Sequence, residues 1–191
     1  MGNRIGLYFG SFNPIHHGHL MIASNIMYKA ELDQLWFVVS PQNPFKTNKA
    51  LLNEYHRLHL VRLAIHDDPR FRVSDIEFRL PKPSYTSDTL SYLGDEYPNH
   101  VFSIVLGSDS LTNFEKWKNF SHILDRYKIW VYERPGFEVR RDLKGSIERC
   151  DAPLIEISST DIRTMVKEGK SIRYFVPENV REEIERSHYY R

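Results

Sequence analysis

The chain has 191 residues, of which 41% are hydrophobic and 27% are charged, and its formal net charge at pH 7 is +1. This length suits one domain with a substantial core, and the near-neutral charge excludes a global field that would attract nucleic acid or an anionic membrane. The single cysteine, Cys150, excludes an internal disulfide, and no apolar run reaches the ~20 residues that span a bilayer. We therefore expect a cytoplasmic protein with no nucleic-acid or membrane partner.

The N-terminal part of the chain predicts a strand, a polar turn and a helix. Residues 4–9 form a short apolar run typical of a buried strand, and residues 20–27 form an apolar run long enough for a packed helix. Between them stands the sequence Gly10-Ser11-Phe12-Asn13-Pro14-Ile15-His16-His17-Gly18-His19. A turn between a strand and a helix brings backbone N–H groups and a helix N-terminus together, which suits a phosphate group.

Two histidines of this turn are candidates for chemistry. His16 and His19 are three residues apart at a helix start, so both rings can point to the same side, whereas His17 is expected to face away. Two such imidazoles can donate hydrogen bonds to phosphate oxygens. They could also be structural or bind a metal, but no carboxylate stands at metal-ligand spacing beside them, so we predict no protein-held metal.

Strands and helices alternate along the rest of the chain. Apolar runs predict five further strands, at residues 35–40, 71–78, 100–107, 128–134 and 154–157. Helices are expected at residues 53–67, from Thr86 or Ser87 as a cap to residue 96, in turns around residues 111–120, after a capping box of Ser158 and Asp161, and from Pro177 onward. Residues 138–149 are polar and charged and predict a surface helix or loop.

The predicted strands are mostly apolar throughout, without the alternation of a half-exposed sheet. This pattern is typical of an α/β fold in which helices cover both faces of a doubly wound parallel sheet, here of five to six strands. Ligands of such sheets bind beyond the carboxyl ends of the strands, at the topological switch point, so the turns after residues 9, 107 and 157 can face one crevice. We predict one domain over residues 1–191, with a helical C-terminal part from about residue 160.

Two stretches resemble the signatures of the nucleotidyltransferase superfamily. The first signature is glycine-[Thr/Ser]-Phe-[Asp/Asn]-Pro-x-His-x-Gly-His, at residues 10–19. The second is Ile-Ser-[Ser/Ala]-Thr-x-Ile-Arg, which residues 158–163 match from its serine onward. Within the superfamily the chain is most similar to the bacterial nicotinate mononucleotide adenylyltransferases, which is supported by residues 44–46, 84–90, 107–111, 117 and 134–136. The resemblance covers essentially the whole chain. The chain departs from the commonest pattern of the family at Phe9, where a glycine is usual, and at Asn13, where an aspartate is common.

The resemblance implies a Rossmann-like fold and a reaction in NAD biosynthesis. The phosphate of nicotinate mononucleotide would attack the α-phosphorus of ATP in line, giving deamido-NAD and pyrophosphate. Because this nucleophile is already anionic, no general base is needed, and catalysis can consist of positioning and charge stabilisation. The implied partners are ATP and nicotinate mononucleotide, with Mg²⁺ accompanying ATP and held mainly by phosphates and water. The oligomeric state is not predicted.

The resemblance also assigns roles to individual residues. The implied catalytic side chains are His16, His19 and Arg163. The implied ATP- and phosphate-binding residues are Gly10, Ser11, Phe12, Gly18, Lys46, Gly107, Asp109, Ser158 and Ser159. Thr86 and Trp117 would bind the mononucleotide, with Trp117 stacked on its pyridine ring. Asp109 could instead be a loop or capping residue, and Trp117 a core residue, because neighbouring apolar residues share its helical spacing.

Other functions fit parts of the pattern. Nicotinamide mononucleotide differs from nicotinate mononucleotide in one ring substituent, so a nicotinamide-preferring or dual-specificity enzyme stays open. Pantetheine-phosphate adenylyltransferases share the first signature but lack the features at residues 84–86 and 117. Class I aminoacyl-tRNA synthetases need a lysine-rich second signature and a tRNA-binding domain, for which this chain has no room. A nucleotide-binding regulator without catalysis need not keep His16, His19 and Arg163 together.

Overall fold

A computed structural model describes residues 2–42, 51–134, 136–137, 145–150 and 156–191. Its centre is a sheet of six parallel strands in the order β3-β2-β1-β4-β5-β6. The strands are β1 (Arg4–Gly10), β2 (Gln34–Val39), β3 (Phe71–Ser74), β4 (Val101–Gly107), β5 (Lys128–Tyr132) and β6 (Ile147–Cys150). The predicted α/β fold with a doubly wound parallel sheet is confirmed.

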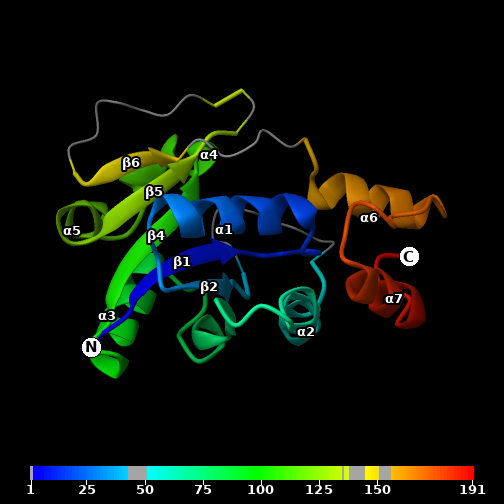
Figure 1. Ribbon diagram of the computed structural model, residues 1–191, viewed down its shortest axis with the longest axis horizontal. Coiled ribbons are helices and arrows are strands. Elements are labelled where there is room, and N and C mark those ends of the chain that lie inside the picture. Colours follow the sequence, from blue (N-terminus) through cyan, green and yellow to red (C-terminus); the bar gives the residue numbers. More distant parts are fainter. Residues whose placement is uncertain (1, 43–50, 135, 138–144, 151–155) are drawn as a thin grey trace.

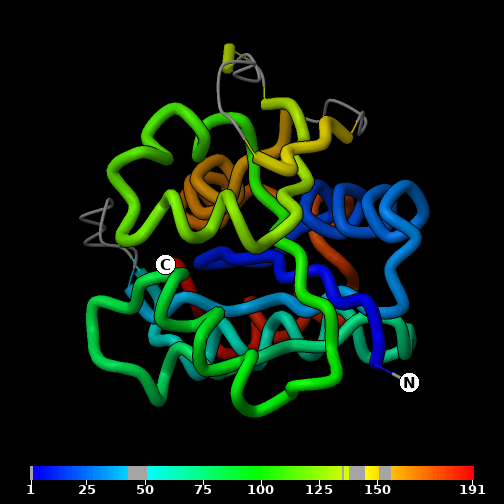
Figure 2. Tube along the Cα trace, turned by 90° about the vertical axis from the view of Figure 1, so that its left-hand side faces the viewer, coloured from blue at the N-terminus to red at the C-terminus, as the bar shows by residue number. Residues whose placement is uncertain are grey.

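Helices cover both faces of this sheet (Figure 1). Helices α1 (His17–Lys29) and α2 (Glu54–Ala64) pack on one face, together with α6 (Ser159–Lys167) and α7 (Glu178–Arg186). The other face is covered by α3 (Thr86–Glu96), α4 (Ser108–Leu111) and α5 (Phe120–Arg126), with the 3₁₀ turns η1 (Ile76–Phe78) and η2 (Phe114–Lys116). Helix α1 lies beside β1 in both views (Figure 1 and Figure 2).

Alternation along each strand explains the continuous apolar runs. In β1, Leu7 packs in the cluster that contains α3 and α5, whereas Tyr8 packs in the cluster that contains α1 and α2. In β2, Trp36 and Phe37 divide between the two clusters in the same way. Successive side chains of a strand point to opposite faces, so a strand that is buried on both faces has no position that favours a polar residue.

The strand order places a topological switch point beside β1. β1 pairs with β2 on one side and with β4 on the other. The pairing register puts Gly10 opposite Val39, and Gly107 opposite Tyr132, each at the carboxyl end of its strand. Figure 1 shows α6 and α7 beyond the end toward which β1 points. This end of a doubly wound sheet is where ligands bind.

Two strand predictions are wrong in their positions. β3 ends at Ser74, and η1 occupies Ile76–Phe78, so the strand predicted at residues 71–78 is too long. The sixth strand is Ile147–Cys150, at the end of the segment predicted as a surface helix or loop, whereas Glu156 and Ile157 lie outside any strand. Residues 138–144 of the predicted surface segment and residues 154–155 of the strand predicted at residues 154–157 lie outside the described residues. The two middle residues of β6 are exposed and charged, so its sequence contains no apolar run that would have predicted a strand.

Helix ends follow the sequence signals in part. The side chains of Asn53 and Ser158 cap α2 and α6, each by accepting a backbone N–H. The N-cap of α3 is Tyr85, without a side-chain hydrogen bond, so the prediction of Thr86 or Ser87 as the cap is wrong. The described helices are all too short or too polar to cross a membrane.

The C-terminal helices contribute to the core through the residues that their spacing indicated. Ile162 of α6 and Val180 and Ile184 of α7 are buried in the cluster that contains α1 and α2. Cys150 at the end of β6 is fully buried in the same cluster. The division into one domain with a helical part from about residue 160 stays a prediction.

Candidate active site

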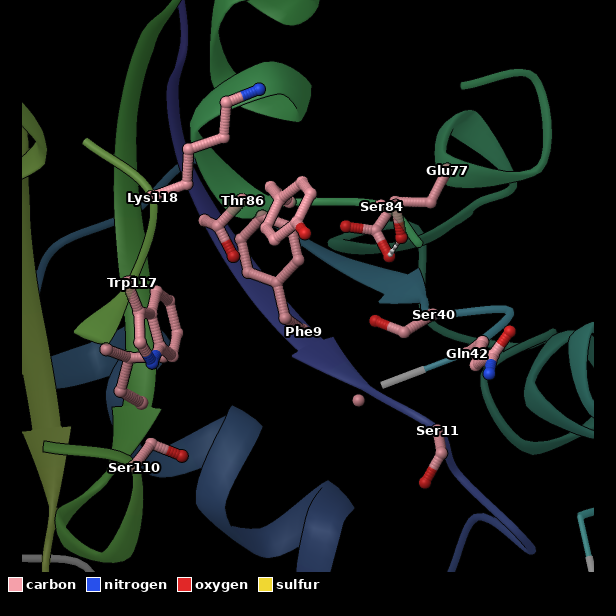
Figure 3. A pocket seen from close by; sticks show the side chains of 13 residues that line it. Phe9, Ser11, Ser40, Gln42, Glu77, Ser84, Thr86, Ser110, Trp117 and Lys118 are labelled. Atoms are coloured by element: carbon pink, nitrogen blue, oxygen red, sulfur yellow. Dashed lines mark hydrogen bonds between the residues drawn. The ribbon is translucent and has the colours of Figure 1, made fainter. Parts of the chain in front are cut away.

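Two adjoining pockets open at the carboxyl ends of β1 and β4. One, which we call the histidine pocket, is lined by His16, His19 and Arg163 among others. The other, which we call the tryptophan pocket, is lined by Thr86 and Trp117 among others (Figure 3). The residues that line both pockets are Phe9, Gly10, Ser11, Leu106 and Ser110. The pockets therefore meet at the switch point of the sheet.

The turn between β1 and α1 contains a residue with a left-handed backbone conformation and is held in place by a buried arginine. Phe12 has φ +44°, in a region that residues other than glycine rarely adopt, and its buried ring packs edge-on against His19 with centroids 5.1 Å apart. Arg57 of α2 is fully buried, and its Nη1 donates to the carbonyl of Ser11 at 2.5 Å and to that of Ser40 at 2.9 Å. Arg57 thus ties the turn to the end of β2.

His16 and His19 face the histidine pocket together. Helix α1 begins at His17, which makes His16 its N-cap, and the rings of His16 and His19 stack with centroids 3.7 Å apart. Gly18 permits this arrangement, because a Cβ there would come within 3.0 Å of the His16 ring. The first turn of α1 contains no acidic residue, so the partial positive charge of the helix N-terminus is available to an anion.

Both histidines are neutral around pH 7. Burial and the nearby Arg134 lower the pKa of His16 from 6.5 to about 3, and burial lowers the pKa of His19 well below 6.5. Their buried Nδ1 atoms have no hydrogen-bond partner among the described residues. A buried ring nitrogen without a partner costs free energy, so a ligand that bonds to these nitrogens would be favoured.

Arg134 brings a permanent cation to the histidine pocket. It follows β5, its Nε lies 3.7 Å from Oδ1 of Asp109, and its backbone N–H donates to Oγ of Ser108 at 2.9 Å. Gly107 at the end of β4 leaves room for this pair, because a Cβ there would collide with the Asp109 carboxylate. Asp109 is therefore already close to a cation in the histidine pocket.

The second signature is joined to the first by two hydrogen bonds. Oγ of Ser159 donates to the carbonyl of Pro14 at 2.9 Å, and Nη1 of Arg163 donates to the carbonyl of Asn13 at 2.8 Å. The hydroxyl proton of Ser159 is thus already used within the protein. A guanidinium has five N–H donors, so Arg163 can bond to the turn and to a ligand at once.

Two walls of the tryptophan pocket come from the start of α3 and from the segment after η2, and Glu77 of η1 and Ser40 after β2 line it as well (Figure 3). Trp117 is half-buried, and its ring lies 5.0 Å from that of Phe114, so it contributes to the core and to the pocket. Thr86 is the first residue of α3. Nζ of Lys118 donates to both carboxylate oxygens of Asp88 at 2.9 Å, which joins the two walls.

Most of the predicted site residues gather in these two pockets. Those in the histidine pocket are Gly10, Ser11, Phe12, His16, His19, Gly107, Asp109, Ser158, Ser159 and Arg163. Thr86 and Trp117 line the tryptophan pocket. Gly18 lies against the His16 ring without lining the pocket, and Lys46 lies outside the described residues.

The structure also brings together residues that the sequence analysis missed. In the histidine pocket these are Tyr8, Tyr132, Arg134 and Thr160, and in the tryptophan pocket they are Ser40, Glu77, Ser84 and Lys118. Arg134 follows a strand, so the rule that strand ends carry ligand-binding groups could have found it. No sequence signal singles out Glu77, which lies inside the strand predicted at residues 71–78.

The donor set of the histidine pocket suits phosphate oxygens. It combines two neutral imidazoles, two guanidinium groups and the N-terminus of α1. Within the described ranges, no three His, Cys, Asp or Glu side chains are grouped so that they could hold a metal ion.

Comparison with known proteins relates the whole chain to one group of enzymes. The model of the cytidylyltransferase-like family matches residues 7–165. Two proteins named probable nicotinate-nucleotide adenylyltransferase are similar over their full length: that of Cytophaga hutchinsonii is 51% identical, covering 98% of each chain, and that of Flavobacterium johnsoniae is 47% identical, covering 98% of this chain and 99% of the relative. Among solved structures, Plasmodium falciparum nicotinic acid mononucleotide adenylyltransferase complexed with NaAD has the same fold, with a TM-score of 0.81 at 20% identity, covering 98% of this chain and 97% of that chain.

Proposed function

The chain belongs to the nicotinate-nucleotide adenylyltransferases of the cytidylyltransferase-like family, and on this basis we propose that it transfers the adenylyl group of ATP to nicotinate mononucleotide. The products are deamido-NAD and pyrophosphate. The protein is thus a nucleotidyltransferase of NAD biosynthesis.

The observation that carries this proposal is the convergence of the two signatures in one pocket. His16 and His19 follow β1, and Arg163 comes from α6, yet all three line the histidine pocket. The adjoining tryptophan pocket offers an aromatic face and a hydroxyl for a pyridine ring with a polar substituent. Two pockets that meet at the end of β1 suit two nucleotides that must react with each other.

In the proposed mechanism the phosphates of ATP occupy the histidine pocket. Each neutral imidazole donates an N–H to a phosphate oxygen, and Arg134 and Arg163 balance the charge that builds up on the leaving pyrophosphate. A phosphate oxygen of the mononucleotide forms the new bond to the α-phosphorus while the bond to pyrophosphate breaks. No proton has to be removed, so the protein contributes positioning and charge stabilisation.

A divalent metal accompanies nucleotide transfer in this family, and we propose that it is Mg²⁺, bound to ATP as part of the substrate. Mg²⁺ usually keeps several waters and binds phosphates plus one or two carboxylates. Asp109 offers such a carboxylate in the histidine pocket. When bound, the ion neutralises part of the phosphate charge.

Nicotinate mononucleotide would place its ring in the tryptophan pocket. Trp117 would stack on the ring and Thr86 would lie near its carboxylate, which is supported by their position in one pocket. A cytoplasmic location and the absence of nucleic-acid partners stay predictions, based on the single cysteine and the near-neutral net charge.

Pyrophosphate release from ATP and Mg²⁺ tests the proposal, with nicotinate mononucleotide, nicotinamide mononucleotide and phosphopantetheine compared in parallel. We expect kcat/KM for nicotinate mononucleotide to be at least ~100-fold above the others, a preference of ~2.7 kcal/mol. Comparable rates with nicotinamide mononucleotide would make the protein a dual-specificity enzyme. Pyrophosphate release with none of the three would contradict the proposed adenylyltransferase activity and favour a nucleotide-binding regulator.

A further inference from the structure

A buried carboxylate lines the tryptophan pocket without a role in the reaction described above. Glu77, in η1, is only 2% exposed, and Figure 3 shows its carboxylate hydrogen-bonded to Ser84. Oγ of Ser84 donates to Oε2 at 3.0 Å, and Oγ1 of Thr89 donates to Oε1 at 3.0 Å. Both carboxylate oxygens are therefore fixed in orientation by hydroxyl groups.

No described cation balances the charge of this carboxylate. Burial raises the pKa of Glu77, the nearby hydroxyl groups of Ser40, Ser84 and Thr89 counteract that rise, and no basic side chain among the described residues acts on it. The other charged residue of the pocket, Lys118, is already paired with Asp88. A buried carboxylate without an opposite charge is costly, and a cationic ligand in the same pocket offsets part of that cost.

We propose that Glu77 is a specificity-determining residue whose carboxylate attracts the positively charged ring of a pyridinium nucleotide. This inference rests on the proposed function and concerns its mononucleotide site. The ring nitrogen of nicotinate mononucleotide is bonded to ribose and therefore carries a positive charge at every pH. In Figure 3, Glu77 comes from the β2 side of the pocket and Trp117 from the β4 side, and the face of an indole ring also attracts a cation.

Such a pocket selects for the charge of the ring as well as for its shape. An uncharged ring of the same size would fill the space beside Trp117 but leave Glu77 buried without an opposite charge. Because the ring stays charged throughout adenylyl transfer, Glu77 attracts the substrate and the transition state equally, and its loss should appear in KM rather than in kcat. A carboxylate that only ordered the surrounding loops would not distinguish a charged from an uncharged ring.

The test compares nicotinate mononucleotide with the C-nucleotide in which a 3-carboxyphenyl ring replaces the pyridinium ring. KM and kcat are measured by pyrophosphate release with ATP and Mg²⁺, and Kd by titration calorimetry. We expect the parent to prefer the charged ring by about tenfold or more in kcat/KM, and Glu77→Gln to reduce this preference to about threefold or less. Glu183→Gln is the matched control and should keep the preference of the parent, because Glu183 is also a buried, hydroxyl-bonded carboxylate but lines neither pocket.

The outcomes separate this proposal from the proposed function. An equal preference in the parent and in Glu77→Gln, with both active, overturns the role of Glu77 and leaves the adenylyltransferase intact. No turnover of nicotinate mononucleotide by the parent contradicts the proposed function itself. If circular dichroism shows that Glu77→Gln does not fold, the parent and Glu77→Asp decide. Aspartate draws the carboxylate back by one methylene, so a preference in Glu77→Asp clearly below that of the parent supports the proposal. An unchanged preference in Glu77→Asp, or a preference in the parent below about threefold, overturns it.

Discussion

His19 lies where charge would develop in the histidine pocket. Its ring stacks on that of His16, packs against Phe12, and is kept neutral by burial. We predict that His19→Ala keeps the fold and lowers kcat/KM by about 10²–10³, because it removes one donor aimed at the reacting phosphates. Pyrophosphate release measures the rate and circular dichroism the fold. His17→Ala is the control, since His17 lines neither pocket, and an activity of His19→Ala within about threefold of the parent contradicts the role.

Arg163 should act mainly on ATP and pyrophosphate. Its guanidinium donates to the carbonyl of Asn13 and lines the histidine pocket, away from Trp117. We expect Arg163→Ala to raise KM for ATP and to slow the reverse reaction from pyrophosphate, because a cation beside the leaving group is lost. Initial rates at varied ATP and varied mononucleotide separate the two effects, with Lys167→Ala, on the exposed side of α6, as the control. A rise in KM for the mononucleotide alone would show that Arg163 is placed wrongly.

At the residue scale, sequence reasoning succeeded where local spacing fixes the direction of a side chain. His16 and His19 follow from the start of a helix, and Arg163 follows from the apolar stripe that turns it away from the core. The hydrogen bond from Ser159 to Pro14 could not be predicted, because it depends on the backbone path of a turn in which Phe12 has a positive φ. Glu77 could not be predicted either, since its hydrogen-bond partners Ser84 and Thr89 lie beyond the turn that contains it, in a loop and in α3.

At the element scale, α2 positions the turn after β1 through one side chain. Arg57 donates to the carbonyls of Ser11 and Ser40, and also to those of Leu52 and Pro41 at 2.8 and 3.1 Å. We predict that Arg57→Met lowers the free energy of unfolding by about 3 kcal/mol or more, because several buried carbonyls lose their donor. Arg57→Lys should restore part of this loss.

Urea unfolding measures this effect, and initial rates show whether KM for ATP rises with the loosened turn. Arg62→Met is the matched control, since Arg62 is exposed on the same helix, and it should change stability by less than about 0.5 kcal/mol. A loss of stability no larger for Arg57→Met than for Arg62→Met contradicts the role of Arg57 in holding the turn.

The elements themselves were predicted best where burial is continuous. β1, β2, β4 and β5 are central strands, and their apolar runs reveal them. β6 is an edge strand with exposed Glu148 and Arg149, so the apolar run after it looked more like a strand than β6 itself. The end of β3 was missed for a related reason, because Ile76 is buried in a 3₁₀ turn and extends the apolar run past the strand.

At the scale of the whole molecule, the strand order decides which pockets lie side by side. With β1 between β2 and β4, the turn after β1 borders both pockets, and Gly10 and Ser11 line each of them. Alternation of strands and helices predicts that such a switch point exists, but it does not say which residues of distant loops reach it. The tryptophan pocket was therefore the less predictable half of the site.

The same burial that shapes the histidine pocket should make the whole protein sensitive to acid. Burial, and after it the nearby Arg134, lower the pKa of His16 from its ordinary value of 6.5 to about 3 in the folded protein. Between these values the unfolded chain binds a proton that the folded protein excludes, so the free energy of unfolding falls as the pH is lowered from 6.5, by about 1.4 kcal/mol per pH unit for one such group.

His16→Gln removes this contribution, and we predict that its stability relative to the parent rises as the pH falls. Urea unfolding from about pH 7.5 to about pH 4.5 measures the difference, with His122→Gln, exposed on α5, as a surface control. A difference between His16→Gln and the parent that does not change with pH would mean that His16 is able to take up a proton in the folded protein, and hence that it could meet the phosphates as a cation.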